Sequence, residues 1–250
     1  MASINYANRE IVIKIVYYGP GLSGKTTNLQ VIHQNVPDTT KGNMISLATE
    51  ADRTLFFDLL PLNLGSVKGF NTKFQLYTVP GQVYYNATRK LVLKGVDGVV
   101  FVADSTQGKM NENIESLQNL KDNLTEYGID LNNFPIVLQY NKRDLDNLYS
   151  LDELNKALNP YNAPFFEASV IKNVGVFETL KAISRETLAR INKQPNATAP
   201  GQETAKPAAA PAAAAPTPAP QAAPAAPAQG GAQPQGAFFK NLINKMEDKK

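Results

Sequence analysis

The sequence predicts an α/β fold: a doubly wound, mostly parallel six-stranded sheet flanked by about five helices, with a disordered C-terminal tail. Two observations support this prediction. Short apolar runs bounded by turn residues alternate with segments of helical periodicity, which is typical of consecutive βαβ units. A glycine-rich segment, 19–26, follows the first apolar run, 11–18, and precedes a helical pattern, which is the strand–loop–helix order of such sheets.

The elements are expected in the following order along the chain. After the strand at 11–18, a helix is expected over about 25–34. An antiparallel strand then leads through a turn at 65–69 into the strand at 74–79. Further strands are expected at 98–103, 134–140 and 163–167, and further helices near 83–94, 111–127, 151–158 and 176–193.

Composition limits the classes of protein to consider. Apolar residues make up 43% of the 250 residues, so 1–194 can bury the core of one sizeable domain. The net charge of +3 gives no electrostatic footprint for nucleic acid. The absence of cysteine rules out disulfides, thiolate metal sites, palmitoylation and prenylation. The sequence shows no myristoylation glycine, no secretory segment and no apolar run of about 18 residues, so we expect a cytoplasmic protein without a lipid anchor or a transmembrane segment.

The composition changes after Gln194. Residues 195–235 are rich in Ala and Pro, and closely spaced prolines break helices, so this segment is expected to be a disordered linker. Residues 236–250 form a short amphipathic segment, with the apolar residues on one helical stripe. Three interpretations of that segment stay open: docking to a protein partner, weak binding to a membrane surface, or no role. Its stripe consists of Phe238, Phe239, Leu242, Ile243 and Met246.

The segment 19–26 reads Gly-Pro-Gly-Leu-Ser-Gly-Lys-Thr and matches the phosphate-binding pattern G-x-x-x-x-G-K-[ST]. Its backbone N–H groups are expected to face phosphates, with Lys25 supplying a charge and Thr26 a hydroxyl for Mg²⁺. This pattern does not distinguish ATP from GTP, so an ATP-dependent kinase or ATPase stays open at this point. The residues expected to bind the phosphate end of a nucleotide are Gly19, Gly21, Leu22, Ser23, Gly24, Lys25, Thr26 and Thr27.

A second motif, Asn141-Lys-Arg-Asp144, follows the strand expected at 134–140 and matches N-K-x-D. The Asp144 carboxylate suits two adjacent N–H donors, which guanine has on one edge and adenine lacks. Asn141 is expected to tie this loop to the phosphate loop, and the aliphatic stem of Lys142 to cover the base. Ala168 and Ser169, after the next strand, are expected to supply a backbone N–H to the guanine carbonyl, although that signal is weak by itself.

With both motifs present, the chain resembles the Ras-like small GTPases, and within them the MglA group of bacterial polarity and gliding-motility GTPases. The likeness covers residues 1 to about 190 and excludes the tail. It rests on long matching strings at 14–22, 49–58, 77–82, 93–104 and 139–145, among them Thr-Glu-Ala-Asp-Arg-Thr-Leu-Phe-Phe-Asp and Tyr-Thr-Val-Pro-Gly-Gln.

The resemblance implies a P-loop small GTPase fold and a switch that alternates between GTP and GDP states with Mg²⁺. Thr54 matches the threonine of switch I that binds Mg²⁺ and senses the γ-phosphate. In switch II, Gly81 matches the glycine whose N–H meets the γ-phosphate, and Gln82 the glutamine that orients the attacking water. Arg53 matches an arginine that neutralises charge in the transition state.

One departure concerns magnesium. Ordinary Ras relatives carry an aspartate that holds a magnesium-bound water, and the matching position here is Thr78. A neutral hydroxyl does not replace the charge of a carboxylate. Our hypothesis is that Asp58 or Asp52 compensates and acts on the metal indirectly.

The resemblance also implies partners. These are a GTPase-activating protein of the Roadblock/LC7 type (MglB-like), and effectors of polarity or motility, with recruitment to a cell pole. Because Thr78 weakens the case for turnover, a GTP-binding sensor or scaffold with negligible hydrolysis stays open as the alternative function.

Overall fold

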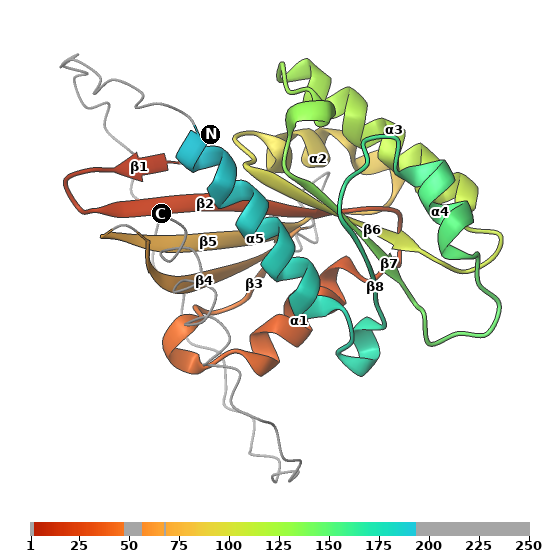
Figure 1. Ribbon diagram of the computed structural model, residues 1–250, viewed down its shortest axis with the longest axis horizontal. Helices are drawn as coiled ribbons and strands as arrows, with labels where there is room; N and C mark the ends of the chain where they lie inside the picture. Colours follow the sequence, from red (N-terminus) through yellow and green to blue (C-terminus); the bar gives the residue numbers. More distant parts are fainter. Residues whose placement is uncertain (1–2, 48–56, 68, 194–250) are drawn as a thin grey trace, which may run out of the picture.

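The computed structural model describes residues 3–47, 57–67 and 69–193, which form one mixed sheet covered by helices on both faces (Figure 1). The strand order is β3-β4-β5-β2-β6-β7-β8, and β1 pairs with the start of β2. Neighbouring strands from β5 through β2, β6 and β7 to β8 are parallel, whereas β4 is antiparallel to both β5 and β3. The strands are β1 (Ser3–Asn5), β2 (Glu10–Tyr18), β3 (Ile45–Leu47), β4 (Phe57–Val67), β5 (Phe70–Thr78), β6 (Gly98–Asp104), β7 (Ile136–Asn141) and β8 (Phe165–Glu167).

Five α-helices cover the sheet within the described residues. Helices α1 and α5 lie on one face, and α2, α3 and α4 lie on the other (Figure 1). The α-helices are α1 (Lys25–Asn35), α2 (Asn86–Leu93), α3 (Met110–Glu126), α4 (Leu151–Leu158) and α5 (Val176–Lys193). Short 3₁₀ turns complete the chain: η1 (Asp38–Thr40), η2 (Val83–Tyr85), η3 (Leu131–Asn133) and η4 (Val170–Lys172).

Strand β2 explains why helices cover both faces of the sheet. Its side chains alternate between the two faces, and both sets are buried: Ile15 and Tyr17 pack with α1 and α5, whereas Val16 and Tyr18 pack with α2 and α3. A parallel strand that is apolar on both faces must be sandwiched between layers of helices. The apolar run at 11–18 therefore determines the architecture as well as the strand.

The fold class and the five helices agree with the sequence prediction, but the sheet has eight strands rather than six. The two additional strands, β1 and β3, have three residues each, which is too short for a periodic pattern to reveal. The turn expected at 65–69 is also shorter, because β4 continues to Val67 and β5 begins at Phe70. A register shift between Asn63 and Ser66 accommodates the glycine inside β4.

The parallel strands end along one edge of the sheet. The register pairs Tyr18 with Phe101 and Asp104 with Asn141, so the segments that follow β2, β6 and β7 emerge side by side. Loops at the carboxyl ends of parallel strands are where doubly wound folds bind their ligands. Within the described residues, no helix combines the length and the hydropathy needed to cross a membrane.

Candidate functional site

The phosphate loop runs from the end of β2 to the start of α1. Gly24 precedes α1 in the left-handed conformation, with φ of 102°, which an L side chain rarely adopts. A Cβ atom there would also overlap the side-chain amide of Asn141. Helix α1 has no acidic residue in its first turn, so its positive end stays available for an anion. The backbone therefore forms the cradle that the sequence motif predicts.

Lys25 lies inside this cradle. It is only 6% exposed, and its Nζ donates hydrogen bonds to the carbonyl oxygens of Gly19 at 3.0 Å and Pro20 at 2.6 Å. Burial, and secondarily the nearby charge of Arg89, lowers the pKa of Lys25 to about 7. A buried ammonium whose partners are neutral carbonyls is an electrostatically unsatisfied cation, and an anionic ligand is the partner that would satisfy it.

The base loop, 141–144, contacts the phosphate loop through Asn141. This residue is buried, its Nδ2 donates to Ser23 O at 2.7 Å, and its Oδ1 accepts from the N–H of Val170 at 3.1 Å. One amide thus joins three loops that are distant in sequence. The buried Gln139 also pairs with Asn28 of α1 through two hydrogen bonds of 2.8 and 3.1 Å, which attaches β7 to the same helix.

Asp144 lies at the outer end of the base loop. Its Oδ1 accepts a hydrogen bond of 2.7 Å from the Ser169 hydroxyl, and this bond holds the pKa of Asp144 below its ordinary value. The N–H groups of Ala168 and Ser169 donate to Tyr140 O and Val174 O. Both N–H groups are thus engaged by backbone carbonyl groups, and Ser169 contacts Asp144 through its hydroxyl.

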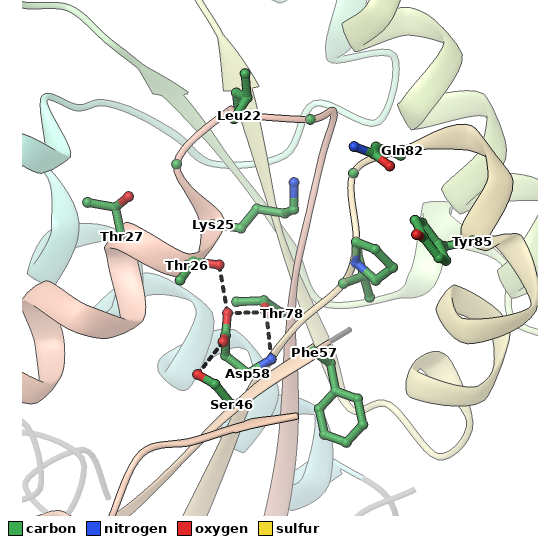
Figure 2. Close-up of a pocket in the computed structure, with 15 residues that line it drawn as sticks. Leu22, Lys25, Thr26, Thr27, Ser46, Phe57, Asp58, Thr78, Gln82 and Tyr85 are labelled. Atoms are coloured by element: carbon green, nitrogen blue, oxygen red, sulfur yellow. Dashed lines mark hydrogen bonds between the residues drawn. The ribbon is translucent and has the colours of Figure 1, made fainter. Parts of the chain in front are cut away.

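A single carboxylate, that of Asp58 on β4, gathers three hydroxyl groups beside the phosphate loop (Figure 2). Thr26 Oγ1 donates to Asp58 Oδ2 at 2.6 Å, Thr78 Oγ1 to the same oxygen at 2.8 Å, and Ser46 Oγ to Oδ1 at 2.7 Å. The Asp58 N–H returns a bond of 2.9 Å to Thr78 Oγ1. A carboxylate on the neighbouring strand therefore lies beside Thr78 and within hydrogen-bond distance of Thr26.

The segment 80–82 lies against the phosphate loop, and Arg89 of α2 holds it there. Arg89 is 4% exposed; its Nε donates to Pro80 O at 2.9 Å, and its Nη2 donates to Gly81 O at 3.2 Å and to Gln82 O. Its Nη1 donates to Asn119 Oδ1 on α3 at 2.7 Å. A Cβ on Gly81 would overlap the backbone of the phosphate loop, so only glycine permits this close approach.

The phosphate loop, the Asp58 cluster of hydroxyl groups and the segment 80–82 line a cavity of about 570 Å³ (Figure 2). The cavity brings together Lys25 and Thr26 with Asp58, Thr78 and the segment containing Gln82. It does not include the base loop. Three expected site residues, Asp52, Arg53 and Thr54, lie outside the described residues. Of the remaining residues expected at the phosphate end, Gly21, Leu22, Gly24, Thr27 and Gly81 also line the cavity, whereas Gly19 and Ser23 lie behind it and contact Lys25 and Asn141 through their carbonyl oxygens.

Three residues of the candidate site were not predicted from the sequence: Ser46, Arg89 and Asp104. Ser46 and Arg89 belong to no short motif, and their roles depend on contacts across the sheet and between helices. Asp104 forms an ion pair with Lys142, with Oδ2 and Nζ 2.6 Å apart. The sequence did contain a signal for Asp104, since it is an acidic residue at the end of an otherwise apolar strand.

Leu22 was expected at the site, but its conformation was not predicted: it is 91% exposed and has a φ of 60°.

Residues 14–189 match the model of the Ras family. The chain is 60% identical over 193 residues to the mutual gliding-motility protein MglA of Myxococcus xanthus (strain DK1622), an alignment that covers 77% of this chain and 99% of that protein.

The pKa of Lys25 generates a prediction about proton uptake. Near pH 8.5, a lysine with a pKa of about 7 is mostly neutral in the free protein, and a bound diphosphate favours its charged form. Binding of GDP should therefore take up close to one proton. Calorimetric titrations in two buffers of different ionisation enthalpy measure this uptake. Lys25→Arg, whose side chain stays charged at that pH, is the matched control and should abolish it. Equal heats in both buffers for the parent protein would contradict the assignment.

Proposed function

Since this chain belongs to the Ras family, we propose that it is a GTP-binding molecular switch that hydrolyses GTP to GDP and signals through its switch segments. One observation carries the proposal. Asn141 joins the base loop to the phosphate loop through its 2.7 Å bond to Ser23 O, so the two motifs act as one nucleotide site. Separate sites for a phosphate and a purine would not need this bridge.

The chemistry of Asp144 supports guanine as the base. A carboxylate with a lowered pKa stays ionised and accepts hydrogen bonds only. Guanine offers it two donors, N1–H and the 2-amino group. Adenine would place an acceptor against the charge and leave it unpaired, which is heavily penalised. We assign the phosphates to the N-terminus of α1 and to Lys25.

The residues around Asp58 fit a magnesium ion. Mg²⁺ prefers oxygen ligands and binds through one or two protein groups together with phosphates and waters. Thr26 and Thr54 would hold it directly, and Asp58, with Thr78 oriented by it, would act through a bound water. When bound, the ion neutralises charge on the β- and γ-phosphates.

For hydrolysis, we assign Gln82 to orienting the attacking water, the Gly81 N–H to the γ-phosphate and Arg53 to the charge that develops in the transition state. Arg89 holds the carbonyl groups of 80–82 and so fixes the direction of the Gly81 N–H. Unaided turnover in Ras is slow, on the order of 10⁻⁴ s⁻¹, and activating partners raise it by up to about 10⁵. We therefore propose slow turnover that a Roadblock/LC7-type (MglB-like) activating protein stimulates.

The cellular role is inferred from the relative. A protein 60% identical over nearly its whole length is called a mutual gliding-motility protein. We propose that this chain likewise controls cell polarity and surface motility, from the cytoplasm and with recruitment to a cell pole. Residues 195–235 would act as a linker, and 236–250 as the segment that docks a protein partner or a membrane surface.

The alternative is a GTP-binding sensor or scaffold with negligible hydrolysis. The observation in its favour is the close packing of 80–82 on the phosphate loop, held by three hydrogen bonds that Arg89 donates to the carbonyl oxygens of this segment. A segment fixed in this way would not deliver Gln82 to a γ-phosphate. Turnover of GTP in the presence of an activating protein decides between the two functions.

Gln82→Leu tests the catalytic assignment. The leucine is similar in size but has no amide to orient a water, so single-turnover hydrolysis should fall by at least about tenfold. GTP affinity should change less than about threefold, because the side chain is exposed. Asn119→Leu, at the far end of the Arg89 contacts, makes a comparison for general disturbance of the region. Turnover at the parent rate in Gln82→Leu would refute the assignment.

Asp58→Asn tests the magnesium assignment. The change keeps an acceptor oxygen for Thr26 and Thr78, leaves an NH2 group facing Ser46 and removes the charge, so the Mg²⁺ concentration that half-maximally slows GDP release should rise about tenfold. Affinity for GDP in EDTA should change little. Asp38→Asn, at an exposed carboxylate on η1 that pairs with Lys41, serves as the charge-matched control. An unchanged Mg²⁺ requirement in Asp58→Asn would mean that another group holds the metal.

A further inference from the structure

The end of β6 and the start of the base loop meet at a partly buried ion pair. Asp104 is the last residue of β6, and its register partner on β7 is Asn141. Lys142 follows directly, with φ of 68°, an unusual backbone conformation for a residue other than glycine. This conformation turns the Lys142 side chain back toward β6, where its Nζ lies 2.6 Å from Asp104 Oδ2.

The two partners differ in exposure. The side chain of Asp104 is 3% exposed and that of Lys142 is 31% exposed, so the pair is closed to solvent on the aspartate side. The other oxygen, Oδ1, accepts from the Thr106 N–H at 3.0 Å and from the Thr106 hydroxyl at 2.6 Å. Burial alone would raise the pKa of Asp104, but the bonds from Lys142 and Thr106 outweigh it and hold that pKa below its ordinary value. A carboxylate fixed on one side in this way is a rigid anchor for an ammonium on the other.

A lysine side chain has a long flexible stem, and ordering it costs conformational entropy. If the stem is to cover a base, its conformation must become fixed either when the ligand binds or before the ligand binds. An ion pair at the ammonium fixes the conformation before binding, because it holds the far end of the stem while the backbone holds the near end. Preorganisation of this kind slows ligand release without adding any contact to the ligand.

We propose that Asp104 is a positioning residue for nucleotide retention: it holds the ammonium of Lys142 so that the aliphatic stem forms a fixed cover over the plane of the bound purine. The inference rests on the proposed guanine site and adds a residue that belongs to neither motif. Asp104 touches no ligand itself. It acts through Lys142, and it favours any purine equally, because it acts on the plane of the base and not on its edge.

A second ion pair provides the comparison. Arg143, the variable residue of N-K-x-D, pairs through Nε with Glu167 Oε2 at 2.9 Å, and Glu167 is 50% exposed. Arg143 also donates to Tyr149 O at 2.8 Å. An exposed pair is screened by water and salt and contributes little. Glu167→Gln is therefore a matched carboxylate-to-amide control on the other side of the same loop.

The test is the dissociation rate of GDP carrying a fluorescent ribose substituent, measured by displacement with excess unlabelled GDP. In Asp104→Asn, the amide Oδ1 still accepts from Thr106, but Nδ2 offers no acceptor to Lys142. Release should be about tenfold faster, the scale of a hydrogen bond between charged groups. Lys142→Met, which keeps an unbranched stem without the charge, should show a similar increase. Glu167→Gln should stay within about twofold of the parent.

The double variant Asp104→Asn/Lys142→Met separates positioning from general loop stability. If Asp104 acts through Lys142, the double variant should release GDP no faster than Lys142→Met alone. A further tenfold increase in the double variant would show that Asp104 supports the loop directly, and an unchanged rate in Asp104→Asn would show that the pair does not retain the ligand. Either result overturns the proposal.

The same assay with inosine diphosphate distinguishes this proposal from the proposed function. Inosine diphosphate lacks the 2-amino group, so its rate relative to GDP reports on the base edge. Asp104→Asn should accelerate both ligands by the same factor and leave their ratio unchanged, whereas a change in the ratio would contradict action on the base plane. If the parent protein does not prefer GDP to ADP, the guanine site itself has failed, which is visible before any variant is compared.

Discussion

The amide of Asn141 is the interaction on which the site depends. It is a buried side chain that donates to Ser23 of the phosphate loop and accepts from Val170. Both ends of the amide are satisfied, and a buried amide with one partner removed would carry the cost of an unmade hydrogen bond. The glycine at position 24 leaves the space that the Asn141 side chain occupies. Asn141 therefore ties three loops together and holds the phosphate loop beside the base loop, as the proposed single nucleotide site requires.

The sheet makes that contact possible. It also explains the positions of two carboxylates, Asp58 and Asp104, that belong to neither short motif. Because parallel strands end together, Asp104 of β6 reaches the residue that follows Asn141 of β7. Because β4 runs antiparallel to β5, Asp58 lies across from Thr78 and shares its hydroxyl. In both places a carboxylate acts from a neighbouring strand. Charge at the site is therefore set by register between strands as well as by sequence within one loop.

The sequence was sufficient for the features that depend on local patterns. The helices at 110–126, 151–158 and 176–193 have apolar periodicity, and the helix at 25–35 follows directly on the phosphate motif. The positions of all four were predicted to within a residue or two. The three-residue strands β1 and β3 were missed, because each is formed by pairing with a longer neighbour, β1 with β2 and β3 with β4.

The residues of the candidate site also divide into those that the sequence could predict and those that it could not. The phosphate and base motifs could be predicted because their chemistry lies within a few consecutive residues. The roles of Arg89 and Ser46 could not be predicted, because their contacts exist only after folding. Arg89 donates to three carbonyl groups of 80–82, and the Ser46 hydroxyl on β3 donates to the Asp58 carboxylate on β4. The N–H groups of Ala168 and Ser169 illustrate the same limit, since backbone pairing within the fold engages both.

The central claim is that the two motifs form one site that selects guanine, and competition binding tests it most directly. The measurement is the displacement of labelled GDP from the parent protein by unlabelled GDP or ADP at the same Mg²⁺ concentration. The account predicts that ADP needs at least about a thousandfold higher concentration than GDP, because adenine leaves the Asp144 carboxylate without donors. Displacement by ADP at concentrations comparable to GDP would contradict it.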